Sequence, residues 1–332
     1  RPLILAGGGA RRAAEILTAL AERLQAPVAL TTNARGLLVP EHPLLLDGVQ
    51  SSAHGRKLFA EADVVLAVGT ELGETDYDFF GLGPLAFNAP LIRLDIDPLQ
   101  VLGVQPATVG LLGDAEQGLR ALLARLPQRE ADSTWASERV ARVNAIERAG
   151  WSAQQSRMQA LLDTVRDHLP QPLIVGDSTQ PVYQGALGYR APTPNSWFNA
   201  GSGYGTLGYG LPAAIGAKLA QPLRPVVALV GDGGLQFSSA ELIAAKEAGV
   251  GVILLLWNNS SYAEIRDYMN AKAVPLLGVD ILTPDFAALA QSCHVTHHRV
   301  SDLHGLRELL EQLGNINEPV MVEVDAATFL AD

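Results

Sequence analysis

The chain has 332 residues, 48% of them apolar and 18% charged, so it can bury two sizeable cores without disulfides or metal staples. Its single cysteine, Cys293, excludes an intrachain disulfide framework, and we interpret it as a buried, inert thiol in a reducing compartment, the cytoplasm. A formal net charge of −11 argues against a nucleic-acid partner and an anionic membrane surface, and no apolar run of about 18 residues is present to cross a membrane.

The first part of the chain alternates short apolar runs with amphipathic stretches, the pattern of a doubly wound parallel sheet. Strands are predicted over 3–6, 28–31, 64–68 and 91–95, and a helix over 11–24. Gly7, Gly8 and Gly9 match only part of a dinucleotide fingerprint, so a tight strand-to-helix turn is the preferred interpretation. We therefore predict a Rossmann-like α/β domain over 1–130.

The rest of the chain repeats this pattern after a charged stretch. Residues 131–150 read as a helix-forming linker with a break at 131–133, and a second doubly wound α/β domain is predicted over 151–332. Its predicted strands are 173–175, 225–231, 252–257 and 320–324, and its predicted helices are 152–168, 238–249 and 262–269, the last followed by a loop over 270–280.

Two neighbouring strands of the second domain end in polar residues that suit a metal and a diphosphate. Gly231, Asp232 and Gly233 close one strand, and Asn258 and Asn259 close the next. A carboxylate and an amide oxygen are hard ligands for Mg²⁺ or Ca²⁺. Glycines on both sides of Asp232 let backbone N–H groups approach a phosphate at the strand ends. The alternative is a glycine turn and a polar turn in an ordinary α/β domain.

Two further blocks in this domain suit a phosphorylated cofactor. A glycine-rich stretch over 203–216 contains Gly205 and Leu207, although loop glycines around a core leucine would look the same. The strand at 173–175 leads into Asp177, Ser178, Thr179 and Gln180, where a hydroxyl and an amide can donate to phosphate oxygens. A helix-capping turn is the alternative for this block.

In this order the three blocks resemble the thiamine-diphosphate-dependent enzymes of the acetolactate synthase, benzoylformate decarboxylase and pyruvate oxidase family, over nearly the whole chain. The resemblance implies that Asp232, Asn259 and the carbonyl of Ser261 hold the metal. It also implies that Leu207 wedges between the two rings of the cofactor and that Gly205 accepts a hydrogen bond from its 4′-amino group. The candidate cofactor-binding residues are Thr179, Gln180, Gly205, Leu207, Gly231, Gly233, Gly234, Ser261 and Tyr262.

The stretch 1–130 resembles the central domain of this family, which binds FAD in acetolactate synthases. Flavin-binding members carry an arginine where this chain has Glu71, and the acidic run that begins there and ends at Asp76 would repel a flavin diphosphate, so FAD is not expected. Family members also have a pyrimidine-binding domain whose glutamate activates the cofactor. These 332 residues lack it, so alone they are expected to be inactive, with that glutamate on the remainder of a longer chain or on another chain.

The resemblance implies decarboxylation of a 2-oxo acid, and a homodimer or homotetramer for the complete protein. Leu207 and Glu264 are the candidate catalytic residues, and the segment around Glu264 resembles decarboxylases of 5-guanidino-2-oxopentanoate, whose cationic tail a carboxylate would suit. Glu264 could instead make an interface contact or relay a proton. The alternatives for the protein are an acetolactate synthase, a non-catalytic cofactor-binding paralogue, and a nucleotide-binding α/β module that ATP, CoA or FAD would stabilise.

The histidines receive no chemical role. His294, His297 and His298 cluster loosely, but their sequence neighbours lack the carboxylate or cysteine partners of a metal site. An exposed loop is predicted there.

Overall fold

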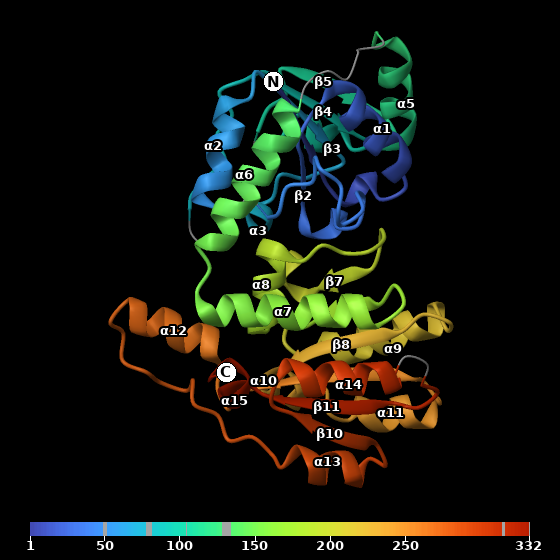
Figure 1. Cartoon of the computed structure of the whole chain (residues 1–332), viewed down its shortest axis with the longest axis vertical. Coiled ribbons are helices and arrows are strands. Elements are labelled where there is room, and N and C mark those ends of the chain that lie inside the picture. Colours follow the sequence, from blue (N-terminus) through green and yellow to red (C-terminus); the bar gives the residue numbers. More distant parts are fainter. Residues whose placement is uncertain (49–51, 78–81, 104, 128–133, 314–315, 332) are drawn as a thin grey trace. The chain divides into compact units, whose positions relative to one another are not determined.

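The computed structural model describes residues 1–48, 52–77, 82–103, 105–127, 134–313 and 316–331. It divides into two compact units, each with its own parallel sheet (Figure 1). Unit 1 comprises Arg1–Trp151 and Ala186–Ser196, and unit 2 comprises Ser152–Gly185 and Trp197–Asp332. Two parallel α/β sheets confirm the predicted fold class.

Unit 1 contains a five-stranded parallel sheet in the order β2-β1-β3-β4-β5. Its strands are β1 Pro2–Ala6, β2 Val28–Leu30, β3 Val64–Val68, β4 Leu91–Asp95 and β5 Val109–Leu112. Its helices are α1 Ala14–Leu24, α2 Ala53–Glu61, α3 Glu74–Tyr77, α4 Pro98–Val101, α5 Ala115–Arg125 and α6 Trp135–Ala149, with short 3₁₀ turns at Gly8–Ala10 and Thr32–Ala34. The sequence did not predict β5, an edge strand whose four residues are all exposed.

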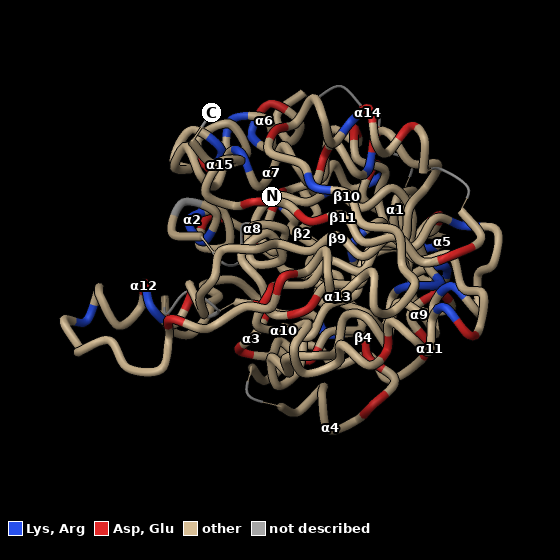
Figure 2. The backbone as a smooth tube through the Cα atoms, turned by 90° about the horizontal axis from the view of Figure 1, so that it is seen from below, with Lys and Arg blue, Asp and Glu red and all other residues tan. Residues whose placement is uncertain are grey.

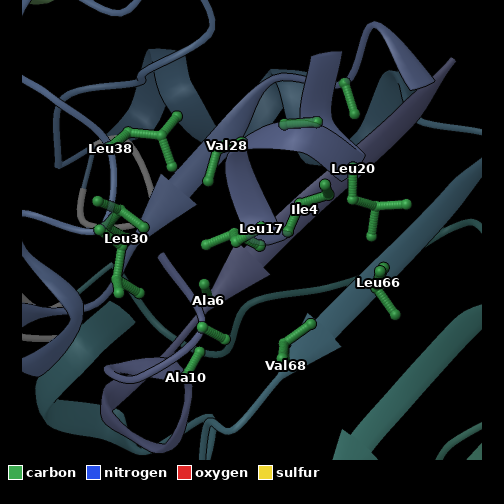
Figure 3. Packing of buried hydrophobic residues seen from close by; sticks show 14 of the residues in the cluster. Ile4, Ala6, Ala10, Leu17, Leu20, Val28, Leu30, Leu38, Leu66 and Val68 are labelled. Carbon is green, nitrogen blue, oxygen red and sulfur yellow. The ribbon is translucent and has the colours of Figure 1, made fainter. Parts of the chain in front are cut away.

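Each face of this sheet carries its own apolar core. Ile4 of β1 and Leu17 of α1 meet on one face (Figure 3). Leu119 of α5 belongs to the same core. Phe59 of α2 and Val140 of α6 lie on the other face. Because both faces are covered, the strands read as continuous apolar runs in the sequence rather than as alternating ones.

The segment 186–196 lies in unit 1, although it was expected within the domain 151–332. Gly48 donates a backbone hydrogen bond of 2.7 Å to the carbonyl of Leu187, and Arg190 pairs with the buried carboxylate of Asp47 at 2.8 Å. Helix α6, expected within the linker 131–150, also packs in unit 1, and the break expected at 131–133 lies outside the described residues. Contacts made far from the local chain therefore set the unit boundaries.

The glycines after β1 are accounted for by loop packing. A Cβ atom on Gly7 would lie 2.3 Å from the carbonyl oxygen of Gly69, and Gly9 donates a hydrogen bond of 2.9 Å to the same oxygen. The turns after β1 and β3 thus contact each other directly, as the tight-turn interpretation expects. This contact lies at the topological switch point of the sheet, where dinucleotides bind in related folds.

Unit 2 contains a six-stranded parallel sheet in the order β10-β11-β9-β8-β6-β7. Its strands are β6 Leu173–Gly176, β7 Trp197–Asn199, β8 Val226–Gly231, β9 Val252–Asn258, β10 Thr296–Val300 and β11 Val320–Asp325. Its helices are α7 Ala153–His168, α8 Gln180–Gly188 (which runs into unit 1), α9 Gly210–Ala220, α10 Asp232–Gln236, α11 Glu241–Glu247, α12 Ala263–Ala271, α13 Phe286–Ser292, α14 Leu303–Leu313 and α15 Ala326–Ala331, with a 3₁₀ turn at Ala200–Ser202.

Helices cover both faces of the second sheet. Leu211 of α9, Leu242 of α11 and Phe286 of α13 share one core with the strands, and Cys293 is buried beside them as predicted. Helix α7 packs against α14 and α15 elsewhere in the unit. In Figures 1 and 2, α12 and the segment after it project away from the body of this unit.

Two local predictions for this unit are wrong. His297 and His298 lie in strand β10 rather than in a loop, because β10 pairs with β11 and the buried carboxylate of Glu323 lies 2.9 Å from Nε2 of His297. The helix predicted over 238–249 is divided, and the chain becomes helical at Asp232 itself, in α10. Within the described part of the chain, none of the helices is long and apolar enough to cross a membrane.

Candidate active site

The carboxyl ends of β6, β8 and β9 meet at one edge of the second sheet. The chain passes from β6 to β7 on one side and then to β8 on the other, so the gap between β6 and β8 is a topological switch point. Ligands of open parallel sheets bind at such points. A cavity of about 180 Å³ lies here. It is lined by Ser178, Thr179, Gln180, Tyr183, Gly205, Leu207, Gly231, Asp232, Gly233, Gly234, Asn259, Ser261, Tyr262, Ala263, Glu264 and Ile265.

All twelve candidate site residues named from the sequence line this cavity. They come from three strand ends, one glycine-rich loop and the start of α12. Parallel strands place their carboxyl ends together, which is why motifs far apart in the chain meet here. Their individual roles stay predictions.

Asp232 has the arrangement expected of a cation ligand. It is only 2% exposed, and Oδ1 accepts a hydrogen bond of 2.8 Å from the N–H of Gly233. Its Oδ2 is buried and has no hydrogen-bond partner in the described structure. Burial raises the pKa of this carboxyl above its ordinary value, and hydrogen bonds from nearby backbone N–H groups partly oppose that rise. Because a buried acceptor without a partner is costly, a bound cation would suit Oδ2.

The loop after β9 brings amide and carbonyl oxygens to the same place. Oδ1 of Asn259 accepts a hydrogen bond of 3.1 Å from the N–H of Ser261, and Ser260 has a φ of +54°. Ser261 is buried and donates through Oγ to the carbonyl of Val279 at 2.9 Å. The described residues contain no group of three His, Cys, Asp or Glu side chains suited to a metal. A metal here would therefore need amide and carbonyl oxygens beside Asp232.

Glycine is required after β8 because other groups approach closely. A Cβ atom on Gly233 would lie 2.4 Å from Cε1 of Tyr262, and one on Gly231 would lie 3.0 Å from Oγ1 of Thr179. Tyr262 and Thr179 therefore occupy the space beside these two positions, and only glycine fits there.

The loop before α9 carries Leu207 to the cavity. Gly205 has a φ of +65° and donates a backbone hydrogen bond of 3.0 Å to Ala200, and Gly208 has a φ of +84°. Left-handed backbone at both positions explains the two glycines in the sequence. Leu207, between them, is half-buried and lines the cavity.

Gln180 links the metal motif to Glu264. Its Oε1 accepts hydrogen bonds from Nδ2 of Asn259 at 3.1 Å and from Nε1 of Trp257 at 3.3 Å. Glu264, at the start of α12, is exposed and lines the cavity. Desolvation by the surrounding protein raises the pKa of Glu264, a hydrogen bond with Gln180 opposes that rise, and Asp267 adds to it.

The sequence reasoning did not name as site residues four that line the cavity, Ser178, Tyr183, Ala263 and Ile265, and it gave no role to the neighbouring Asp177. Asp177 is fully buried at the end of β6. Tyr183 lines the cavity, and burial is the main cause that raises its pKa. Tyr183 lies three residues after Gln180 on α8, so helical spacing could have placed both on one face.

The comparisons with known proteins assign a family to this fold and site. Residues 1–122 match the family model described as the central domain of thiamine pyrophosphate enzymes, and residues 175–324 match that of their C-terminal TPP binding domain. The chain belongs to the thiamine pyrophosphate enzymes.

Three curated relatives span different members of this family. The chain is 44% identical over 308 residues to the probable 2-ketoarginine decarboxylase AruI of Pseudomonas aeruginosa, covering 92% of this chain and 54% of the relative. It is 31% identical to the probable acetolactate synthase large subunit of Methanocaldococcus jannaschii, covering 98% and 57%. It is 28% identical to the pyruvate oxidase of Lactiplantibacillus plantarum, covering 97% and 54%. The chain thus spans about half the length of the curated relatives it matches.

Proposed function

We propose that this chain supplies the diphosphate- and metal-binding part of an active site that decarboxylates a 2-oxo acid with thiamine diphosphate and Mg²⁺. The observation that carries the proposal is the buried, unpartnered Oδ2 of Asp232 inside a cavity at the sheet's switch point. An anionic cofactor and its cation fit there because N–H groups and hard oxygens converge on one volume.

Each binding role follows from the chemistry of the residue. Asp232, Asn259 and the carbonyl of Ser261 would hold Mg²⁺ through oxygen atoms. Thr179 and Gln180 would donate to diphosphate oxygens, together with backbone N–H groups at the start of α10. Oxygen ligands alone favour Mg²⁺ or Ca²⁺ over a softer transition metal.

Thiamine diphosphate, when bound, supplies a carbon nucleophile and an electron sink for the carbon dioxide that leaves. The chain's own residues bind and orient. Leu207 offers an apolar surface to the cavity, which Ala263 and Ile265 also line. Desolvation raises the pKa of Glu264, so this carboxyl keeps a proton to higher pH than an exposed carboxyl does. These properties suit a site that must position a ring and exchange a proton.

For the substrate we propose a 2-oxo acid with a guanidinium tail, 5-guanidino-2-oxopentanoate. The 44% identical relative is named a probable 2-ketoarginine decarboxylase, and Glu264 lines the cavity of this chain. A carboxylate binds a guanidinium through two parallel N–H···O bonds, which gives direction as well as charge. The acidic side chain of Glu264 would therefore favour a cationic tail over pyruvate.

The test uses the full-length protein with thiamine diphosphate and Mg²⁺ and measures carbon dioxide release from 5-guanidino-2-oxopentanoate, pyruvate and benzoylformate. We expect kcat/KM for the guanidino acid to exceed the others at least tenfold. Glu264→Gln should reduce this preference by about 10- to 100-fold, the range expected for losing a charge-assisted contact. The matched control is Glu318→Gln in the same unit, whose carboxylate is exposed on the surface and should leave the preference unchanged. Equal turnover of all three acids would contradict the substrate proposal.

Acetolactate synthesis is the second candidate. One relative described above is named a probable acetolactate synthase, and another is named a pyruvate oxidase. The product from pyruvate distinguishes the two: an aldehyde indicates a decarboxylase, and an acetohydroxy acid indicates a carboligase.

We also propose a homodimer or homotetramer for the full-length protein. Large apolar side chains are exposed on segments bordering the cavity. Tyr204 is fully exposed, and Phe237 is 65% exposed. Exposed apolar groups of this kind mark association surfaces. Sedimentation equilibrium checks the state, and a monomer at micromolar concentration would contradict it.

A further inference from the structure

Asp177 is a buried carboxylate that holds backbone N–H groups from two segments. It follows β6 and is 0% exposed. Its Oδ1 accepts a hydrogen bond of 2.8 Å from the N–H of Ser178, and its Oδ2 accepts one of 2.7 Å from the N–H of Gly208. The backbone N–H of Gly210, at the start of α9, also acts on this carboxylate. Helix α9 has no capping side chain of its own at Tyr209, so a carboxylate from β6 takes that place.

The same carboxylate is packed between the segments that line the cavity. A Cβ atom on Gly234 would lie 2.9 Å from Oδ2 of Asp177, and one on Gly210 would lie 3.2 Å from the backbone nitrogen of Asp177. The N–H of Asp177 donates to Leu229 of β8 at 2.9 Å. Asp177 therefore lies between the turn 178–180, the loop that contains Leu207, and Gly234 of α10.

Its environment is unfavourable for a charge. Among the described residues, no Lys, Arg or His forms an ion pair with Asp177. Burial raises its pKa, and the backbone N–H groups of Ser178, Gly208 and Gly210 oppose that rise. A buried carboxylate without a cation is costly unless its oxygens are satisfied by hydrogen bonds. The N–H groups provide that compensation, so the loop and the carboxylate depend on each other.

We propose that Asp177 is a positioning residue that holds the Leu207 loop against the diphosphate turn, so that the cavity is already ordered before cofactor binds. The statement that cofactor binds in this cavity rests on the proposed function. The contact between the Asp177 carboxylate and the Leu207 loop does not depend on it. Pre-ordering favours binding because the cofactor then does not have to order the loop.

A carboxylate is required for geometric reasons. Asparagine has one oxygen acceptor, so its amide group would face an N–H of either Ser178 or Gly208. Glutamate is longer by one methylene, and Gly234 leaves no room for it. Neither replacement can accept from both segments.

The test compares Asp177→Asn with wild type in the full-length protein. Amide hydrogen exchange of peptides covering 203–210, without cofactor, should be at least tenfold faster in the variant. Calorimetry with thiamine diphosphate and Mg²⁺ should give a Kd about 10- to 100-fold weaker, and kcat should fall while KM for the 2-oxo acid stays within about twofold. Unchanged exchange at 203–210 overturns the proposal.

Two controls separate positioning from a general loss of stability. Leu310→Ala removes a buried side chain of α14 far from the cavity and should lower stability without changing the exchange of 203–210 relative to neighbouring peptides. Asp285→Asn alters another carboxylate that caps a helix, α13, and should leave cofactor affinity unchanged. If Leu310→Ala weakens cofactor binding as much as Asp177→Asn, the positioning role is wrong.

A wild-type measurement covers the case in which Asp177→Asn does not fold. Peptides covering 203–210 should exchange more slowly than the exposed loop 275–278 in the absence of cofactor, and equally fast exchange overturns the proposal. If wild type binds no thiamine diphosphate, the proposed function fails instead, while the exchange data still decide the role of Asp177.

Discussion

Oε1 of Glu323 accepts a hydrogen bond of 2.7 Å from Nδ2 of Asn258, the residue immediately before the candidate metal ligand Asn259. Glu323 is 5% exposed on β11, which pairs with β9, and its other oxygen lies 2.9 Å from Nε2 of His297. Asn258 in turn accepts from the N–H of Ser260 at 3.3 Å. The carboxylate therefore supports the turn that presents Asn259 and Ser261 to the cavity.

Replacing Glu323 with alanine should weaken metal binding without touching a ligand. We expect a loss of about 10- to 100-fold in Mg²⁺ affinity, as is typical when groups that orient ligands are removed. A decrease of about 1 to 3 kcal/mol in the free energy of unfolding should accompany it, because Asn258 loses a buried partner. Titration of Mg²⁺ at saturating thiamine diphosphate, followed by melting temperature, measures the affinity.

The matched control for this prediction is Glu318→Ala. Glu318 is exposed and pairs with Lys246 at 2.6 Å on the surface of the same unit. It should change stability by less than about 1 kcal/mol and leave Mg²⁺ affinity unchanged. Equal Mg²⁺ affinity in Glu323→Ala and wild type would contradict a supporting role for Glu323.

A glycine pair tests the space around the diphosphate loop. Gly233→Ala places a Cβ atom 2.4 Å from the ring of Tyr262, so we expect a destabilisation of about 1 to 3 kcal/mol and weaker cofactor binding. Gly216→Ala, in the exposed part of α9 with no atom near its Cβ, should instead stabilise by about 1 kcal/mol. Urea denaturation compares the two variants. Equal effects would show that the cavity wall has room to adjust.

Removing the carboxylate of Asp232 should separate stability from metal binding. Without metal, Asp232→Asn should be at least as stable as wild type near neutral pH, because a buried charge with an unpartnered oxygen is gone. With thiamine diphosphate and Mg²⁺ at about 100 times Kd, wild type should gain about 2.7 kcal/mol and the variant nothing. Differential scanning fluorimetry with and without chelator measures both. A metal-dependent gain in Asp232→Asn would remove Asp232 from the site, and Asp280→Asn, exposed on the adjoining loop, should behave as wild type.

Asp76 in unit 1 should make stability depend on pH. Burial raises its pKa to about 6, while the backbone N–H of Thr32 and the charge of Arg35 oppose the rise. Between its ordinary value of 3.8 and about 6 the folded chain binds the extra proton. The free energy of unfolding should therefore decrease as pH rises through this window, by about 3 kcal/mol.

Urea denaturation of wild type and Asp76→Asn from about pH 3 to about pH 7, a range that brackets the two pKa values, checks the prediction. The variant should lose this part of the pH dependence while keeping an acceptor for Thr32. Asp114→Asn, an exposed helix cap, should retain the wild-type slope. Parallel curves for wild type and Asp76→Asn would show that Asp76 ionises normally.

Local patterns in the sequence predicted much of the fold and the cavity lining. Strands β1, β3, β8 and β9 are continuous apolar runs, because both faces of a parallel sheet are covered. The motifs at Asp232 and Asn259 follow adjacent strands directly, so their proximity follows from parallel pairing alone. Strand β10 has no such run, because its polar residues, among them two histidines, do not form an apolar pattern that predicts a strand.

The sequence by itself determined which residue types stand at the strand ends, and therefore the family and the kind of ligand. Only the tertiary structure decided how those ends are held. The contact of Asp177 with Gly208, that of Glu323 with Asn258 and the inclusion of 186–196 in unit 1 each join distant segments. No local period encodes such contacts, because a buried polar group finds its partner only when the chain closes around it.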